Sequence, residues 1–334
     1  MRNVRAALVF ILIVTLFAAA CGGAQATAPS SPTSAAVNGS PATIYLNEVV
    51  GLMEANSINR STINWTDFRA QVFARAQGAQ SIADTYPAIS LALGLLNDHH
   101  SFYTAASGSG LGNPSSRRCA APAVSNPAVP ADIGYVRVGS FGGTDIAAVR
   151  AFADSVQDQI RESDRPGLAG WIVDLRGNGG GNMWPMLAGV GPVLGDGVAG
   201  YFIPPSGSLS QWAYSNGAAT VNGSAQARVS SVHVLIRTSP RVAVLTDNLV
   251  ASSGEAVTIS FRARPNARSF GMATCGLSTA NGSYRLSDGA MLYLTTAVMA
   301  DRTGTSYGDS ITPDEMVAGD AQVVERAIAW LRTQ

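Results

Sequence analysis

The chain has 334 residues, and its 22 basic residues balance 22 acidic ones, so the formal net charge at pH 7 is zero. Proteins that bind the phosphate backbone of nucleic acids usually carry a basic excess, so this balance argues against that class. Only 13% of the residues are charged and 46% are hydrophobic, a composition that can fill a sizeable core. The sequence contains no lysine, so no mechanism here can use a lysine amine.

The N-terminus has the pattern of a bacterial lipoprotein signal. Arg2 and Arg5 precede the apolar run of residues 6–17, and small residues lead into Cys21. We therefore predict a signal peptide over residues 1–21 and lipidation of Cys21, which would hold the protein on the outer face of the bacterial cell membrane. An ordinary cleaved signal peptide, giving a secreted protein, is the alternative.

Residues 22–42 are uncharged and rich in Ala, Ser, Thr, Pro and Gly, so they predict a flexible tether. In an oxidising compartment the two remaining cysteines, Cys119 and Cys275, are able to form a disulfide. The sequence leaves a disulfide and two separate thiols equally open, because it does not give the distance between the two residues.

Residues 43–104 predict an N-terminal helical subdomain, because their apolar residues recur with helical spacing. Ser61 or Thr66 would cap a helix there. Residues 105–131 lose this periodicity and collect Gly, Ser and Pro, which is typical of a loop or crossover segment.

From residue 132 to residue 334, strand-like and helix-like runs alternate, which predicts an α/β core with a mixed sheet. The runs 284–286 and 291–296 predict a hairpin whose turn contains Gly289. Residues 320–333 predict a closing amphipathic helix, with apolar side chains on one face.

Four short patterns carry the functional signal. They are LLNDHHSF at residues 95–102, WIVDLRGNGGG at 171–181, VLTDNLVASSGE at 244–255 and GDSITPD at 308–314. The glycines of the second allow backbone N–H groups to approach an anion closely. A serine at the start of a helix, as in the third, sits where the helix favours developing negative charge. Each pattern alone also has an ordinary structural explanation, such as a capped helix or a turn.

Together, in this order and with the strand-like run 134–141, the patterns resemble the C-terminal processing peptidase family over about residues 45–320. This family of serine peptidases includes tail-specific protease and tricorn core protease, and the turn at 250–255 is closest to that of its nisin-resistance type. The resemblance implies an α/β (α+β) fold: a mixed-sheet, ClpP/crotonase-like core with flanking helices, plus the N-terminal helical subdomain. No PDZ domain is expected, because residues 105–131 are too few to form one.

The resemblance assigns the nucleophile to Ser252. Members with a Ser/Lys dyad place a lysine where this chain has Leu277, so that dyad is excluded. The base then falls to His100, as in the tricorn and nisin-resistance types, with its neighbour His99 as the competing candidate. An imidazole with an ordinary pKa of ~6.5 can accept the proton of a serine hydroxyl and return it to a leaving amine.

An acyl-transfer site also needs donors for the tetrahedral oxyanion. The resemblance points to the backbone N–H of Ser253 and that of Gly180, with Gly179 and Gly181 as alternatives for the second donor.

The third member of the catalytic set stays open. Asp309 is the nearest acidic residue, but the glutamate that the tricorn type would place here falls on Tyr307.

Four other polar residues are expected to have structural roles. Asp174 and Arg176 are expected to hold the glycine loop, Glu255 to stabilise the serine turn, and His233 to be an ordinary strand residue. The three histidines lack metal-ligand spacing, and no cofactor or metal is expected.

The sequence thus predicts an extracytoplasmic serine endopeptidase or carboxy-terminal processing peptidase. It would hydrolyse extended peptides, or the C-terminal segments of unfolded proteins, through a Ser252/His100 dyad with a backbone oxyanion hole. Analogy with the nisin-resistance type suggests a peptide antibiotic as one target. A peptide-binding lipoprotein without turnover is the alternative, and an esterase using the same serine is a third hypothesis.

Overall fold

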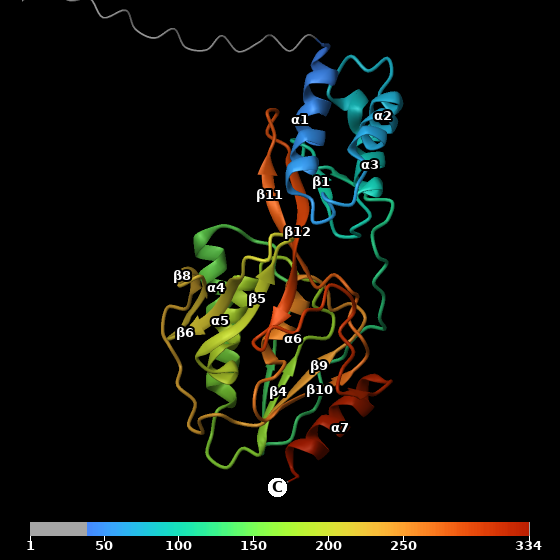
Figure 1. Cartoon of the computed structure of the whole chain (residues 1–334). Helices are drawn as coiled ribbons and strands as arrows, with labels where there is room; N and C mark the ends of the chain where they lie inside the picture. The colour runs from blue at the N-terminus through green and yellow to red at the C-terminus, as the bar shows by residue number, and fades with distance from the viewer. Residues whose placement is uncertain (1–38, 334) are drawn as a thin grey trace, which may run out of the picture. The chain divides into compact units, whose positions relative to one another are not determined.

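The computed structural model describes residues 39–333 of the chain (Figure 1). The predicted signal peptide, Cys21 and most of the tether lie outside these residues. Within residues 39–333, no helix is both long enough and apolar enough to cross a membrane.

Helices form at the N-terminal end of the described chain, as the periodicity predicted. They are α1 (Pro41–Asn56), α2 (Trp65–Arg75), a short 3₁₀ turn (Ala83–Thr85) and α3 (Tyr86–Leu95). The predicted caps are wrong: Asn64 caps α2, and its side chain accepts hydrogen bonds from the N–H groups of Thr66 and Asp67. Thr66 therefore lies inside the first turn, where its own hydroxyl is not needed as a cap.

The helical subdomain is completed by a hairpin from much later in the chain. The hairpin consists of β11 (Thr279–Arg285) and β12 (Met291–Asp301), and the short strand β1 (Phe102–Thr104) pairs with β12, beside β2 (Gly110–Leu111). Leu286, Leu292 and Leu294 of this segment pack into one hydrophobic cluster with buried side chains of α1, α2 and α3. The subdomain is thus not continuous in sequence, which chain order alone did not predict.

A parallel sheet forms the centre of the remaining chain. Its order is β13-β10-β9-β4-β3, with β3 (Ile133–Arg137), β4 (Gly170–Asp174), β9 (Val242–Thr246), β10 (Ala267–Gly271) and β13 (Glu315–Met316). Helices cover it: α4 (Ile146–Ser163), α5 (Met183–Leu194) and α6 (Ser253–Phe261) contribute to one hydrophobic cluster, and α7 (Asp320–Leu331) to another. Every residue of β4 and β9 is buried, as expected for parallel strands covered on both faces.

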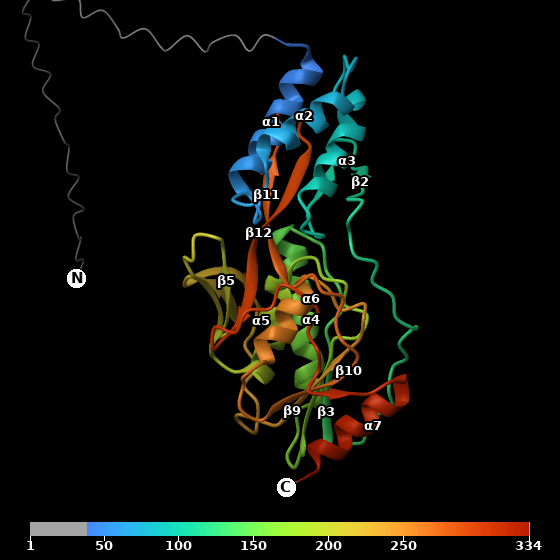
Figure 2. The same cartoon turned by 45° about the vertical axis from the view of Figure 1, so that its right-hand side comes forward.

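A second, antiparallel sheet joins the helical subdomain to this core. Its strands β5 (Gly197–Ile203), β6 (Ser210–Ser215), β7 (Ala218–Val221) and β8 (Ser224–Arg228) follow one another. Residues 291–298 of β12 pair with β11, whereas residues 298–301 pair with β5. A single strand therefore belongs to both parts, as Figures 1 and 2 show.

One predicted strand is absent from the described structure. Residues 232–236 alternate in sequence but form no strand, and His233 is held by its side chain instead. His233 Nε2 lies 3.0 Å from the carboxylate of Asp164. The apolar residues of the alternating pattern, Val232, Val234 and Ile236, are exposed, and Leu235 is buried, so the pattern does not mark an inward face of a strand.

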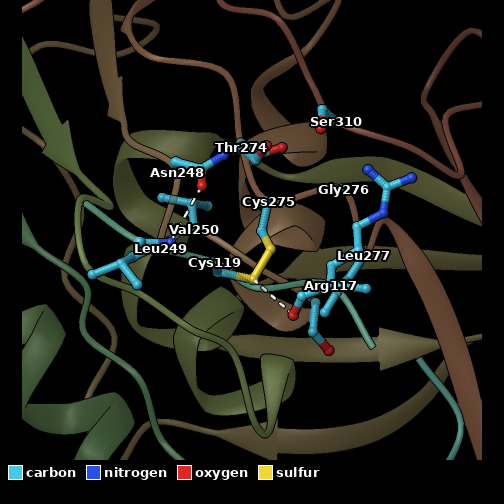
Figure 3. The surroundings of a disulfide bond; sticks show 12 residues. Arg117, Cys119, Asn248, Leu249, Val250, Thr274, Cys275, Gly276, Leu277 and Ser310 are labelled. Atoms are coloured by element: carbon cyan, nitrogen blue, oxygen red, sulfur yellow. Dashed lines mark hydrogen bonds between the residues drawn. A yellow bond between two sulfur atoms is a disulfide. The ribbon is translucent and has the colours of Figure 1, made fainter. Parts of the chain in front are cut away.

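The structure joins Cys119 to Cys275 in a disulfide, with the two Cα atoms 5.3 Å apart (Figure 3). Cys119 lies in the crossover segment between β2 and β3, which contains no helix or strand from residue 112 to residue 132. Cys275 is anchored through its N–H, which donates to the carbonyl of Val250 at 2.8 Å. The disulfide thus fixes the crossover segment to the loop after β10.

Replacing Cys119 and Cys275 together by serine is expected to lower the free energy of unfolding by about 2–4 kcal/mol. The two cysteines are 156 positions apart, so the unfolded chain gains considerable freedom when the bond is lost. Urea unfolding of the oxidised protein, the reduced protein and the double variant measures this. Equal stability of all three would contradict a native disulfide.

Candidate active site

Ser252 stands between β9 and α6 in an unusual backbone conformation. It has φ 52° and ψ −115°, a region that residues with a side chain rarely adopt. Such strain costs on the order of 1–3 kcal/mol and persists only where the surroundings enforce it. A serine on a strained turn before a helix is the arrangement that exposes a nucleophilic hydroxyl in many hydrolases.

The buried carboxylate of Glu255 enforces this conformation. Its Oε2 accepts hydrogen bonds from the N–H groups of Ser252 at 2.9 Å and Leu277 at 2.7 Å. Its Oε1 accepts from Thr274 Oγ1 at 2.5 Å and from the N–H of Gly276 at 2.9 Å. Burial raises the pKa of Glu255, although these hydrogen bonds oppose the shift. Glu255 therefore stabilises the serine turn, as the sequence suggested.

Leu277 supports the serine turn only through its backbone N–H. It occupies the position where a Ser/Lys member of the resembling family has its lysine, and its N–H binds Glu255. The disulfide lies two residues earlier, at Cys275, and the surroundings in Figure 3 include both residues. In this chain the loop of residues 274–277 provides no base and instead stabilises the serine turn through Glu255.

The glycine loop after β4 lies directly against Ser252. A Cβ atom on Gly180 would be 2.7 Å from the carbonyl oxygen of Ala251 and 2.9 Å from Cβ of Ser252. Gly180 also has φ 96°, so only glycine fits here. Arg176 anchors the start of this loop to the end of β4. Its Nη2 lies 2.6 Å from Oδ2 of Asp174 in a buried ion pair.

Gly180, the predicted second oxyanion donor, has its N–H engaged by a neighbouring side chain in this structure. Its N–H donates to Oδ1 of Asn178 at 2.9 Å, and the N–H of Gly179 donates to Ser140 Oγ at 2.8 Å. The side chain of Asn178 would compete with a substrate oxyanion for the N–H of Gly180, because short amide side chains readily bind backbone N–H groups two residues away.

Gly181 and Ser253 keep their donors available. Within the described chain, the N–H of Gly181 has no acceptor, and neither does that of Ser253, which opens α6. The two residues touch, since Ser253 Oγ donates to the carbonyl of Gly181 at 2.7 Å. Ser253 and Gly181 are therefore the residues of the two loops whose N–H groups remain open to an acceptor within residues 39–333.

His100 is held by the start of β11. Its Nδ1 lies 2.7 Å from Thr279 Oγ1, its carbonyl accepts from Asn281 Nδ2 at 3.1 Å, and its N–H donates to Asp98 Oδ1 at 3.0 Å. In the part of the chain that the structure describes, Nε2 makes no hydrogen bond and is not among the fully buried polar atoms that lack a partner. The competing His99 is held elsewhere, with its Nδ1 2.6 Å from the carbonyl of Ser115.

The His100 imidazole is neutral near pH 7. Burial lowers its pKa to about 4, and the carboxylate of Asp98 only partly opposes this. The neutral hydroxyl of Thr279 adds no charge that would stabilise an imidazolium.

A short chain of contacts links His100 to Ser252. Thr279 binds His100, and two residues earlier Leu277 binds Glu255, which in turn binds the N–H of Ser252. Across residues 39–333, no direct hydrogen bond joins Ser252 to His100. Hydrogen bonds of this kind are often long without substrate and shorten only in its complex.

Asp309 does not contact His100 in this structure. Its side chain is 71% exposed and pairs with Arg117 at 2.7 Å. Tyr307 also points elsewhere, since its hydroxyl donates to Asp301. The partner of His100 Nδ1 is thus the hydroxyl of Thr279, and not an acidic side chain.

A cavity of about 610 Å³ lies away from these residues. It is lined at the amino ends of β4 and β9 by Gly170 and Arg241, among others. Ser252 follows the carboxyl end of β9, so this cavity lies at the opposite edge of the parallel sheet.

The low pKa of His100 makes stability depend on pH. Between pH ~6.5 and about 4, the unfolded chain takes up a proton at this residue that the folded protein does not. The contribution of His100 to stability is thus fully present above pH ~6.5, is lost as the pH falls, and levels off below about 4. A His100→Gln variant should lose this part of the slope in urea unfolding, and an NMR titration midpoint of His100 at or above 6.5 would contradict the assignment.

Comparison with known proteins places this chain in a family. Residues 132–317, more than half of the chain, match the model of Peptidase family S41. The nisin-resistance protein of Lactococcus lactis subsp. lactis is 26% identical over 291 residues, covering 87% of each chain.

Solved structures share the fold. A lipoprotein from Streptococcus agalactiae superposes with a TM-score of 0.70 at 22% identity, over 88% of this chain and 97% of that one. The photosystem II D1 C-terminal processing protease gives 0.56 at 16% identity, over 86% and 97% of the two chains. The mixed α/β peptidase fold that the motifs implied is therefore confirmed, and the chain belongs to Peptidase family S41.

Proposed function

We propose that this protein is a serine peptidase in which Ser252 is the nucleophile and His100 the general base. The observation that carries the proposal is the strained turn at Ser252, which a buried carboxylate holds beside two available N–H donors. A serine that only capped a helix would need neither the strain nor the adjoining donors.

The proposed reaction is acyl transfer in two stages. Ser252 Oγ bonds to the substrate carbonyl carbon while its proton moves to His100 Nε2, and the N–H groups of Ser253 and Gly181 donate to the resulting oxyanion. The C–N bond then breaks, and the leaving amine takes the proton from His100. Water repeats the sequence on the acyl-enzyme, which releases the acid and restores Ser252.

Thr279 is the proposed positioning residue for His100. Nε2 can accept a proton only in the tautomer whose Nδ1 carries one, and in that tautomer Nδ1–H donates to Thr279 Oγ1, 2.7 Å away. Because the partner is neutral, the imidazole keeps its low pKa and stays available as a base down to about pH 4.

The proposed substrates are extended peptides or the C-terminal segments of proteins. The names of two similar proteins support this class, one being a nisin-resistance protein and the other a C-terminal processing protease. A peptide antibiotic is therefore one candidate. An extracytoplasmic position with a lipid on Cys21 is also proposed, supported by the fold shared with a streptococcal lipoprotein.

A second candidate is a peptide-binding lipoprotein without turnover. It is favoured by the lack of a direct bond between Ser252 and His100 within residues 39–333, and by the pairing of Asp309 with Arg117.

Incubation of residues 43–334 with a mixed library of unstructured peptides, with products identified by mass, tests the proposal. Ser252→Ala and His100→Ala should each lower kcat/KM by about 10³-fold or more, because both groups act in the same step. His99→Ala is the matched control and should retain activity. Cleavage that survives both substitutions would remove the dyad, and bound but uncleaved peptides would favour the second candidate.

The pH profile tests the role of Thr279. The acidic limb of kcat/KM should have its midpoint near pH 4 in the wild type. Thr279→Asp should move it upward by about one unit or more, because a carboxylate beside His100 stabilises the imidazolium. Thr279→Val should lower kcat with little change in KM, and unchanged profiles in both variants would contradict the assignment.

A further inference from the structure

The sheet of the helical subdomain has one buried and one open face. Ser101 and Tyr103 are fully buried, and Tyr103 packs against the helices. Side chains alternate along a strand, so Phe102 lies on the other face of β1. There its side chain is 38% exposed.

Phe102 is part of an aromatic row across the sheet. It pairs in register with Tyr293 of β12, which pairs on its other side with Ser283 of β11. The rings of Phe102 and Tyr293 stack with their centroids 4.4 Å apart and an interplanar angle of 15°. The row ends at the small, exposed Ser283, so no side chain of the row covers the stacked rings from that side.

The aromatic row is continuous with the proposed catalytic site. The neighbouring row pairs Thr295 with Asn281, whose side chain binds the carbonyl of His100. The N–H of Thr295 donates a hydrogen bond to Ser101 Oγ at 2.9 Å. The position of the aromatic row relative to His100 is therefore fixed by direct contacts.

Phe102 follows His100 by two residues, which corresponds to about 7 Å along an extended chain. A peptide extended along this face would place a side chain two or three residues from the scissile bond over the row. The row itself contains no charged side chain, so it suits an apolar or aromatic group.

We propose that Phe102 and Tyr293 form a subsite for an apolar or aromatic side chain of the peptide substrate, two or three residues from the bond that is cleaved. This inference rests on the proposed function for the identity of the ligand, and it adds a specificity-determining surface on the helical subdomain. An aromatic side chain in the substrate stacks on these partly exposed rings and displaces water from them.

Binding in the Ser252→Ala background separates this subsite from catalysis. Labelled peptides that differ only in a Phe or Gly at successive positions are titrated by fluorescence anisotropy. The Phe peptide with the correct spacing should bind about tenfold more tightly than its Gly partner. Phe102→Ala and Tyr293→Ala should each remove most of that difference while leaving the affinity for the Gly peptide nearly unchanged.

Two further variants keep the test decisive. Thr104→Ala changes the same strand one row further on and should keep the Phe preference, and Phe102→Leu should keep part of it if the fold is intact. Equal weakening of both peptides, or an unchanged Phe preference in both alanine variants, would overturn the subsite. Absence of cleavage by the protein with Ser252 intact, together with a retained Phe preference in the Ser252→Ala background, would contradict the proposed peptidase activity but not the subsite.

Discussion

The arrangement of the site depends on one buried carboxylate. Glu255 accepts four hydrogen bonds, and these join the Ser252 turn at the start of α6 to the loop of residues 274–277. A buried carboxylate without such partners would be strongly unfavourable, so the loop and the turn can only be placed together. The disulfide between Cys119 and Cys275 also holds this loop, by joining it to the crossover segment. Together these bonds keep the Ser252 turn in its strained conformation.

The strand β12 determines where His100 lies relative to the core. The outer part of β12 carries the hairpin that holds His100 through Thr279, and its inner part pairs with β5 of the core. The helical subdomain therefore reaches the serine through hydrogen-bonded strands rather than through a linker. Since the proposed base lies on one part and the proposed nucleophile on the other, a small change in the course of β12 would alter their separation.

Local patterns predicted much of this fold, and long-range pairing explains what they missed. Helical periodicity located α1 to α4 and α7, and Gly289 marked the hairpin, because these signals depend on neighbouring residues. Strands β5 to β8 were not predicted, since the buried apolar residues of 197–228 other than Trp212 and Tyr214 are all alanines, which give a weak strand signal. Thr279 could not be found either: it meets His100 across 179 positions of sequence, through a register that no local pattern encodes.

The central claim is that Ser252 is an activated nucleophile, and covalent labelling with a fluorophosphonate measures this directly. The probe transfers its phosphonyl group to an activated serine hydroxyl with loss of fluoride, and peptide mapping by mass locates the adduct. The account predicts one adduct per chain, on Ser252, and much slower labelling in the His100→Ala and Glu255→Ala variants. No adduct, or an adduct on Ser253 or another serine, would contradict it.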